Sequence, residues 1–229
     1  MRVYVEVVVK VAMCFENKTA LSDWIMPKLH TMLLRSKSER KKYCHQLLGA
    51  VHHCHQHGVM HCDVAPQNCM LRGTGEKTDR IIHPDVDPGL PLFNLALIDF
   101  GNACMLKDDV PIVDKGGETE GFMAPEGTGK DEHERGRTRT KATDVFSCGV
   151  LLREWIFSSR EGVNFSYYHT IEDVDDPNLY PPWHEALSEN DELFDDEDER
   201  DLLLSLVQPN PERRIPLDQA LQHPYCTRN

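Results

Sequence analysis

The chain has 229 residues and 40% hydrophobic residues, enough for one large domain or two small ones with a buried core. Its formal net charge of −13 argues against nucleic acid or an anionic membrane as the main partner, because both select basic surfaces. No apolar run reaches the length of a membrane span. The eight cysteines are scattered and no secretory signal is evident, which predicts reduced thiols and a cytoplasmic or nuclear location.

The first predicted elements are a strand over residues 7–13, which are rich in β-branched side chains, and a short helical piece over residues 21–25. Ser36 and Glu39 form a capping box for a longer helix, which Gly58 ends. This helix places five apolar side chains on one face: Tyr43, Leu47, Leu48, Val51 and Cys54.

Two short strands are predicted next, over residues 69–71 and 95–98. Between them, about residues 73–93, several Gly and Pro residues predict an irregular surface insert. Residues 144–157 are apolar on nearly every side, which predicts a buried helix.

The carboxyl-terminal part begins with an acidic stretch over residues 189–201. We interpret it as a solvated loop and helix start, with a docking patch for basic peptides as the alternative. A helix is predicted over residues 202–207 and a last one over residues 216–223.

One loop and a later triplet contain the candidate catalytic and metal-binding residues. Asp63 stands five positions before Asn68, in a Pro-containing segment after a helix, and Asp99-Phe100-Gly101 follows 36 positions after Asp63. Carboxylate and amide oxygens are ligands that suit Mg²⁺, a hard cation. A carboxylate near an attacking hydroxyl can also act as a general base.

The order and spacing of these motifs resemble a protein kinase. The residues that carry the resemblance are 61–68, 99–101 and 124–126, with further matches at 53–61, 144–149, 210–215 and 220–225. The resemblance implies an α+β, protein kinase-like fold over residues 1–229. Residues 1–18 would be the last strand and hinge of the amino-terminal lobe, and residues 19–229 the helical carboxyl-terminal lobe.

The resemblance also implies ATP and Mg²⁺ as cofactors. Asp63 would accept the proton of the substrate hydroxyl, while Asn68 and Asp99 would bind Mg²⁺. The nucleotide would contact Met13 as gatekeeper and Cys14, Phe15 and Glu16 as hinge. Seven further residues would have structural or regulatory roles: His61, Phe100, Gly101, Thr119, Glu126, Asp144 and Arg214. Among these, Asp144 would bond the backbone of the catalytic loop, and Arg214 would pair with Glu126.

The implied substrate is a protein with Ser or Thr hydroxyls. Residues 119–126 are similar to the segment that precedes and includes Ala-Pro-Glu in serine/threonine kinases. Tyrosine kinases usually have a basic residue and Trp at the places of Phe122 and Met123.

The chain departs from the family pattern in several places. Only 62 residues precede Asp63, so the Gly-rich loop and the paired Lys are not expected among them, and Lys10 is interpreted as an exposed strand residue. Cys62 replaces an Arg that binds phosphate on the activation segment, and Ala65 replaces a Lys aimed at the transferring phosphate. The alternative function is therefore an inactive pseudokinase or scaffold. With either function, the strand over residues 7–13 would have an open edge, which a partner would cover.

Three segments resemble other kinds of site. The His and Cys residues of segment 52–62 resemble a zinc site, but they fall partly on opposite helix faces. Residues 127–130 resemble a phosphate loop but lack its earlier Gly. Cys62 and Cys104 lack an obvious cationic activator, which favours inert thiols.

Overall fold

The computed structural model describes residues 37–73, 93–106, 112–114, 119, 121–127, 137–158, 194 and 196–228. The predicted strand over residues 7–13, the helical piece over residues 21–25 and the hinge positions Met13, Cys14, Phe15 and Glu16 lie outside these ranges. The same holds for Ser36 of the predicted capping box.

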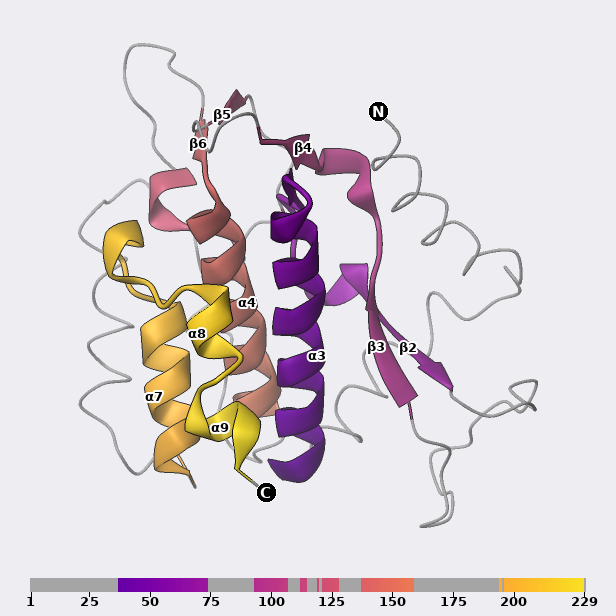
Figure 1. Cartoon of the computed structure of the whole chain (residues 1–229), viewed down its shortest axis with the longest axis vertical. Coiled ribbons are helices and arrows are strands. Elements are labelled where there is room, and N and C mark those ends of the chain that lie inside the picture. Colours follow the sequence, from indigo (N-terminus) through magenta and orange to yellow (C-terminus); the bar gives the residue numbers. More distant parts are fainter. Residues whose placement is uncertain are drawn as a thin grey trace.

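Two long helices, α3 (Lys37–Gln56) and α4 (Lys141–Ser158), lie side by side at the centre of the described structure (Figure 1). The five apolar residues predicted to share a face of α3 are all buried, which confirms this helix. Gly58 follows α3 with a φ of +71°, a left-handed conformation that glycine adopts without steric cost.

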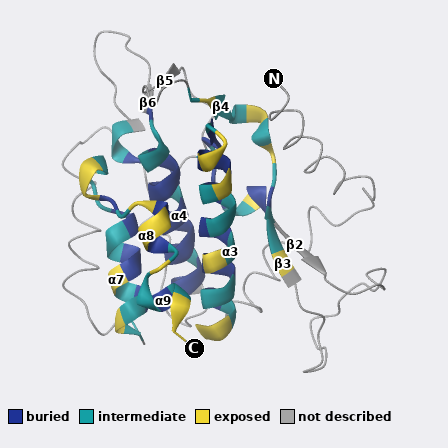
Figure 2. Cartoon of the chain, viewed as in Figure 1, coloured by how far each residue is buried: buried dark blue, intermediate teal, exposed yellow. Residues whose placement is uncertain are grey.

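The predicted helix over residues 144–157 is the central part of α4, and apolar residues on all its sides are buried (Figure 2). On one side α4 packs against α7 (Glu197–Leu206). A Cβ at Gly149 would lie 2.5 Å from a methyl carbon of Val207 and 2.8 Å from the Cβ of Leu206. The two helices therefore approach closely because this position has no side chain.

The carboxyl terminus forms two short helices: α8 (Leu217–Ala220), which lies within the predicted helix over residues 216–223, and α9 (Pro224–Thr227), which follows that range and was not predicted. The prediction was too long because proline disfavours a helical conformation in the residue before it. His223 is accordingly extended, with a ψ of 145°, and its side chain accepts a hydrogen bond from the backbone N–H of Tyr225. The chain therefore ends one helix and starts another.

The acidic stretch is not simply solvated. Asp196 caps α7 by accepting hydrogen bonds from the N–H groups of Asp198 and Glu199, as expected at a helix start. Glu199, in contrast, is fully buried and forms an ion pair with Arg40 of α3, 2.9 Å from its Nε. Tyr225 of α9 donates its hydroxyl to the same carboxylate. One acidic residue thus ties three helices together.

The strands form three antiparallel pairs within the described ranges. β1 (Val59–Met60) pairs with β4 (Cys104–Met105), and β2 (Cys69–Gly73) pairs with β3 (Phe93–Leu97) in a register that joins Cys69 to Leu97. β5 (Ile112–Asp114) pairs with β6 (Arg137–Arg139), a pair that the sequence did not predict. β2 ends at Gly73 and β3 begins at Phe93, so the rest of the expected insert, residues 74–92, lies outside the described ranges.

These elements give an α+β fold in which the β2–β3 ribbon lies on the opposite side of α3 from α7, α8 and α9 (Figure 1). The core lies between α3, α4 and α7, and it continues to the loops at the carboxyl-terminal end of α3. None of the helices described has the length and apolar composition that a membrane crossing requires.

Candidate functional site

The loop that follows β1 is held by the first turn of α4. Both carboxylate oxygens of Asp144 accept backbone N–H groups, from His61 and Cys62, each at 2.8 Å. The imidazole of His55 lies 2.8 Å from the same carboxylate. The contact between Asp144 and this loop is therefore the one that the sequence predicted.

The pKa of Asp144 reflects two opposing effects. Burial alone would raise it, because a low dielectric disfavours a charged carboxylate. Hydrogen bonds and charge from His55, with the N–H group and ring of His61, reverse this effect and hold the pKa of Asp144 below its ordinary value. The carboxylate is therefore ionised at neutral pH and keeps its two acceptor oxygens for the loop.

Two residues of the site have left-handed backbones although neither is glycine: Cys62, with a φ of 63°, and Asp99, with a φ of 60°. Such conformations cost about 1–3 kcal/mol and occur most often at functional sites. Each of these two residues directly precedes a part of the predicted site. Asp99 is followed by the turn Phe100–Asn102, and Cys62 directly precedes Asp63.

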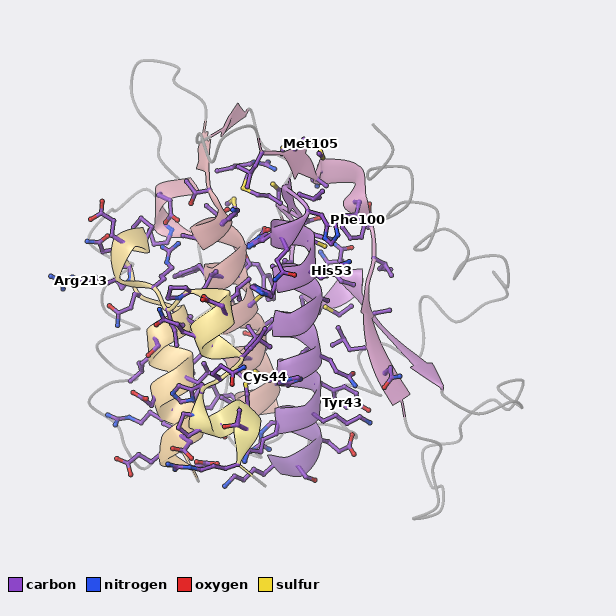
Figure 3. All side chains as sticks on the ribbon, viewed as in Figure 1. Tyr43, Cys44, His53, Phe100, Met105 and Arg213 are labelled. Atoms are coloured by element: carbon purple, nitrogen blue, oxygen red, sulfur yellow. The ribbon has the colours of Figure 1, made fainter. Side chains whose placement is uncertain are left out.

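The loop of residues 61–68 and the segment of residues 98–101 are joined directly. The N–H group of Ile98 donates to the carbonyl oxygen of Asn68 at 2.8 Å, and a ring nitrogen of His61 lies 2.9 Å from the carbonyl oxygen of Ile98. The rings of His61 and Phe100 meet edge to face, with centroids 4.7 Å apart. Phe100 lies near the carboxyl-terminal end of α3 (Figure 3).

The carboxylate of Asp63 accepts four hydrogen bonds. Its Oδ1 atom accepts from the backbone N–H of Thr119 at 2.9 Å and from the Thr119 hydroxyl at 2.6 Å. Its Oδ2 atom accepts from the side-chain amides of Asn68 at 2.9 Å and Asn102 at 3.4 Å. The predicted residues Asp63, Asn68 and Thr119 therefore form one contiguous network.

Asp99 is exposed, and its Oδ1 atom accepts the backbone N–H of Gly101 at 3.1 Å. A Cβ at Gly101 would lie 3.0 Å from that oxygen, so a glycine here lets the chain turn tightly around the carboxylate. An exposed carboxylate next to the Asn68 loop is suited to a cation that keeps part of its water shell, as Mg²⁺ usually does.

The predicted ion pair between Glu126 and Arg214 is present. An Nη2 of Arg214 lies 2.7 Å from Oε2 of Glu126, and the other end of the guanidinium contacts Oε1, so the pair is bidentate. Arg214 also donates to the carbonyl oxygens of Ala142 and Gln208, and its side chain is only 1% exposed. The pair joins the Ala-Pro-Glu segment to the chain after α7.

The zinc and reactive-thiol alternatives find no support in the described part of the chain, whereas residues 128–130 of the phosphate-loop alternative lie outside it. The histidines of segment 52–61 have separate partners: His52 with Gln56, His55 with Asp144, His57 with the carbonyl of His53, and His61 with Ile98. No group of three or more His, Cys, Asp or Glu side chains that could hold a metal ion occurs among the residues described. Burial and the charge of Asp144 raise the pKa of Cys62 well above its ordinary value, as expected for an unreactive thiol.

Three contacts of the site were missed from the sequence. Gln67 donates its amide to the Thr119 hydroxyl, Asn102 reaches Asp63, and the buried Arg139 donates to the carbonyl oxygen of Asn102 at 3.3 Å. Gln67 could have been suspected, because it lies between two predicted site residues. Arg139 could not, since its position depends on the pairing of β5 with β6.

Comparison with known proteins identifies the family of this chain. A family model described as the protein kinase domain matches residues 3–226. The mouse dual specificity protein kinase TTK is 32% identical over 209 residues, which cover 86% of this chain and 21% of that protein. The CBL-interacting serine/threonine-protein kinase 24 of Arabidopsis thaliana is 28% identical over 206 residues, which cover 84% of this chain and 36% of that protein.

A third relative, the probable serine/threonine-protein kinase HAL5-like of Vanderwaltozyma polyspora, is 28% identical over 195 residues, covering 79% of this chain and 22% of that protein. The chain thus spans between 21% and 36% of the length of these three relatives. The family model covers nearly the whole chain. The chain therefore belongs to the protein kinase superfamily.

Proposed function

We propose that this chain carries the phosphoryl-transfer site of an ATP-dependent protein kinase that acts on Ser or Thr hydroxyls. The observation that supports this most is the network in which Asn68 donates to Asp63, while the backbone of Asn68 is bonded to the segment that contains Asp99. The names of two of the relatives above, both serine/threonine-protein kinases, favour Ser or Thr as the acceptor.

In this proposal Asp63 is the general base. It accepts the proton of the substrate hydroxyl as that oxygen bonds to the terminal phosphorus of ATP and the bond from this phosphorus to ADP breaks, with ADP as the leaving group. Assistance of this type contributes about 10²- to 10⁴-fold. The side-chain oxygens of Asn68 and Asp99 would hold Mg²⁺, which would neutralise charge on the phosphates. An amide oxygen and a carboxylate fit this ion, because Mg²⁺ usually takes one or two carboxylates together with phosphate oxygens and water.

The proposed domain organisation follows the family. Residues 19–229 form the helical carboxyl-terminal lobe, and residues 1–18 the last strand of the other lobe and the hinge. In the hinge, Met13, Cys14, Phe15 and Glu16 contact the adenine of ATP. The rings of Phe100 and His61 pack edge to face, which supports a structural role for both.

A pseudokinase or scaffold is the second candidate. Two replacements favour it: Cys62 stands where the family usually has an Arg, and Ala65 stands where it usually has a Lys. Loss of one such preorganised charge typically lowers turnover by about 10²- to 10³-fold. A scaffold of this kind would not need to bind nucleotide, so nucleotide binding separates the two candidates.

We expect Mg-ATP to raise the melting temperature of the chain, and Asp99→Asn to abolish most of this rise. Ligand at 100 times its dissociation constant stabilises a protein by about 2.7 kcal/mol. Removing the Asp99 charge weakens the hold on the metal, while the exposed position of this side chain leaves the unliganded fold stable. The measurement is a thermal melt with Mg²⁺ alone and with Mg-ATP.

Asp218→Asn is the matched control, because Asp218 is also an exposed aspartate but lies on α8, away from the site. It is expected to keep the full shift. An unshifted melt of the parent chain would favour the scaffold over the kinase.

A further inference from the structure

The side chain of Gln67 is exposed, yet its amide is engaged in the site. It donates a hydrogen bond to Oγ1 of Thr119 at 2.5 Å. Thr119 in turn donates both its hydroxyl and its backbone N–H to Oδ1 of Asp63. A continuous chain of donors therefore runs from Gln67 through Thr119 to the proposed general base.

The direction of this chain follows from the chemistry of a hydroxyl group. A Thr hydroxyl has one hydrogen to donate and two lone pairs that can accept. When the Gln67 amide occupies a lone pair, the single hydrogen remains directed at Asp63. Consecutive hydrogen bonds of this kind polarise and strengthen one another.

The composition of the loop makes Gln67 the donor available for this task. Between Asp63 and Asn68, the side chains of Val64, Ala65 and Pro66 have no hydrogen-bond donor. The amide of Asn68 is directed at Asp63 itself, 2.8 Å from its carbonyl oxygen and 2.9 Å from its Oδ2. In this segment only Gln67 is left to orient the Thr119 hydroxyl.

We propose that Gln67 is a positioning residue, which fixes the Thr119 hydroxyl so that it holds the Asp63 carboxylate in the orientation for proton acceptance. In this way the Gln67 amide supplies a hydrogen-bond donor in a loop where Ala65 supplies none. This inference rests on the proposed kinase function for its effect on turnover. Its structural part, the support of the contact between Thr119 and Asp63, is independent of that function.

The key variant is Gln67→Glu, because Glu has the same shape as Gln but cannot donate when ionised. Its carboxylate would compete with Asp63 for the Thr119 hydrogen. A side chain that only filled space would be replaced by Glu without effect. Gln67→Ala removes the donor without adding a competitor, so it is expected to have the same effect as Gln67→Glu or a smaller one.

Two quantities are measured on the full chain: hydrogen exchange at the backbone N–H of Thr119, and the kcat and KM for phosphoryl transfer from ATP. We expect Gln67→Glu to accelerate the exchange and lower kcat, each by roughly 2- to 10-fold, the equivalent of one hydrogen bond. The KM for ATP is expected to stay unchanged, because the Gln67 amide bonds Thr119, which is not one of the proposed metal ligands. The controls are Gln56→Glu and Gln56→Ala, since Gln56 is an exposed Gln whose amide bonds His52 on the same helix.

Exchange and kcat equal to the parent's in Gln67→Glu would overturn the role of Gln67. If the parent chain transfers no phosphate, the proposed function fails. The exchange rate at Thr119 then still decides whether Gln67 supports the contact. Faster exchange in both Gln67 variants, with no change in the Gln56 variants, would support it.

Discussion

Asp63→Asn is expected to lower phosphoryl transfer by about 10²- to 10⁴-fold, the usual contribution of a positioned general base. An amide of the same size cannot take up the proton of the substrate hydroxyl. The measurement is the rate of transfer from ATP to a Ser- and Thr-containing peptide mixture. It is made at saturating ATP, so that a change in nucleotide affinity does not enter the rate.

The Asp63→Asn variant should remain folded, although it cannot keep all the hydrogen bonds that the Asp63 carboxylate accepts. Each oxygen of Asp63 faces donors, from Thr119 on one side and from Asn68 and Asn102 on the other, so an NH₂ group must face a donor at one position. An unsatisfied polar contact of this kind costs about 1–3 kcal/mol. Asp218→Asn serves again as the control with full activity. A purified Asp63→Asn chain that is folded and transfers phosphate at the parent's rate would refute the assignment.

Arg214→Ala is expected to lower the free energy of unfolding by about 3–5 kcal/mol, because it leaves one partner of a largely buried ion pair alone. The loss extends beyond Glu126. Arg214 also donates to the carbonyl oxygens of Ala142, Gln208 and Pro209, and its guanidinium lies 4.9 Å from the ring centroid of Phe146. One substitution would therefore free a carboxylate and three carbonyl groups at once.

The neighbouring Arg213 provides the matched control, because it is exposed and points away from the helices at the edge of the molecule (Figure 3). Arg213→Ala should unfold like the parent. For Arg214→Ala, a loss of that size corresponds to a fall in melting temperature of about 6–20 °C. The two arginines are compared by denaturant unfolding. Equal midpoints for both variants would show that the pair with Glu126 contributes little to stability.

The helices could be predicted because their patterns are local. Apolar residues at helical spacing place one face of α3 in the core, and a sequence that is apolar on all sides places α4 there. The site could be anticipated because its residues stand in short motifs at fixed spacing. The motifs led us to expect that Asp144 would contact the loop of His61, and that Asn68 would lie beside Asp63, and both contacts are present.

What the sequence could not reveal depends on contacts between distant residues. The acidic stretch was interpreted as solvated because composition counts charges but not partners, whereas Glu199 meets Arg40, which is 159 positions away. The pairing of β5 with β6 and the contact of Arg139 with Asn102 depend in the same way on tertiary packing. The break between α8 and α9 is different, because it could have been predicted from the sequence. Pro224 disfavours a helical conformation in the residue before it, His223.

In the proposed site, Asn68 and Asp99 together hold the metal of a bound nucleotide beside Asp63. Replacing Mg²⁺ by paramagnetic Mn²⁺ in the presence of ATP, and following the nuclear magnetic resonance signals of the chain, tests this placement. We expect the signals of Asn68, Asp99 and Asp63 to broaden together at low Mn²⁺, while that of Arg213 stays sharp. Broadening that spares either Asn68 or Asp99, or that appears equally at Arg213, would contradict this placement.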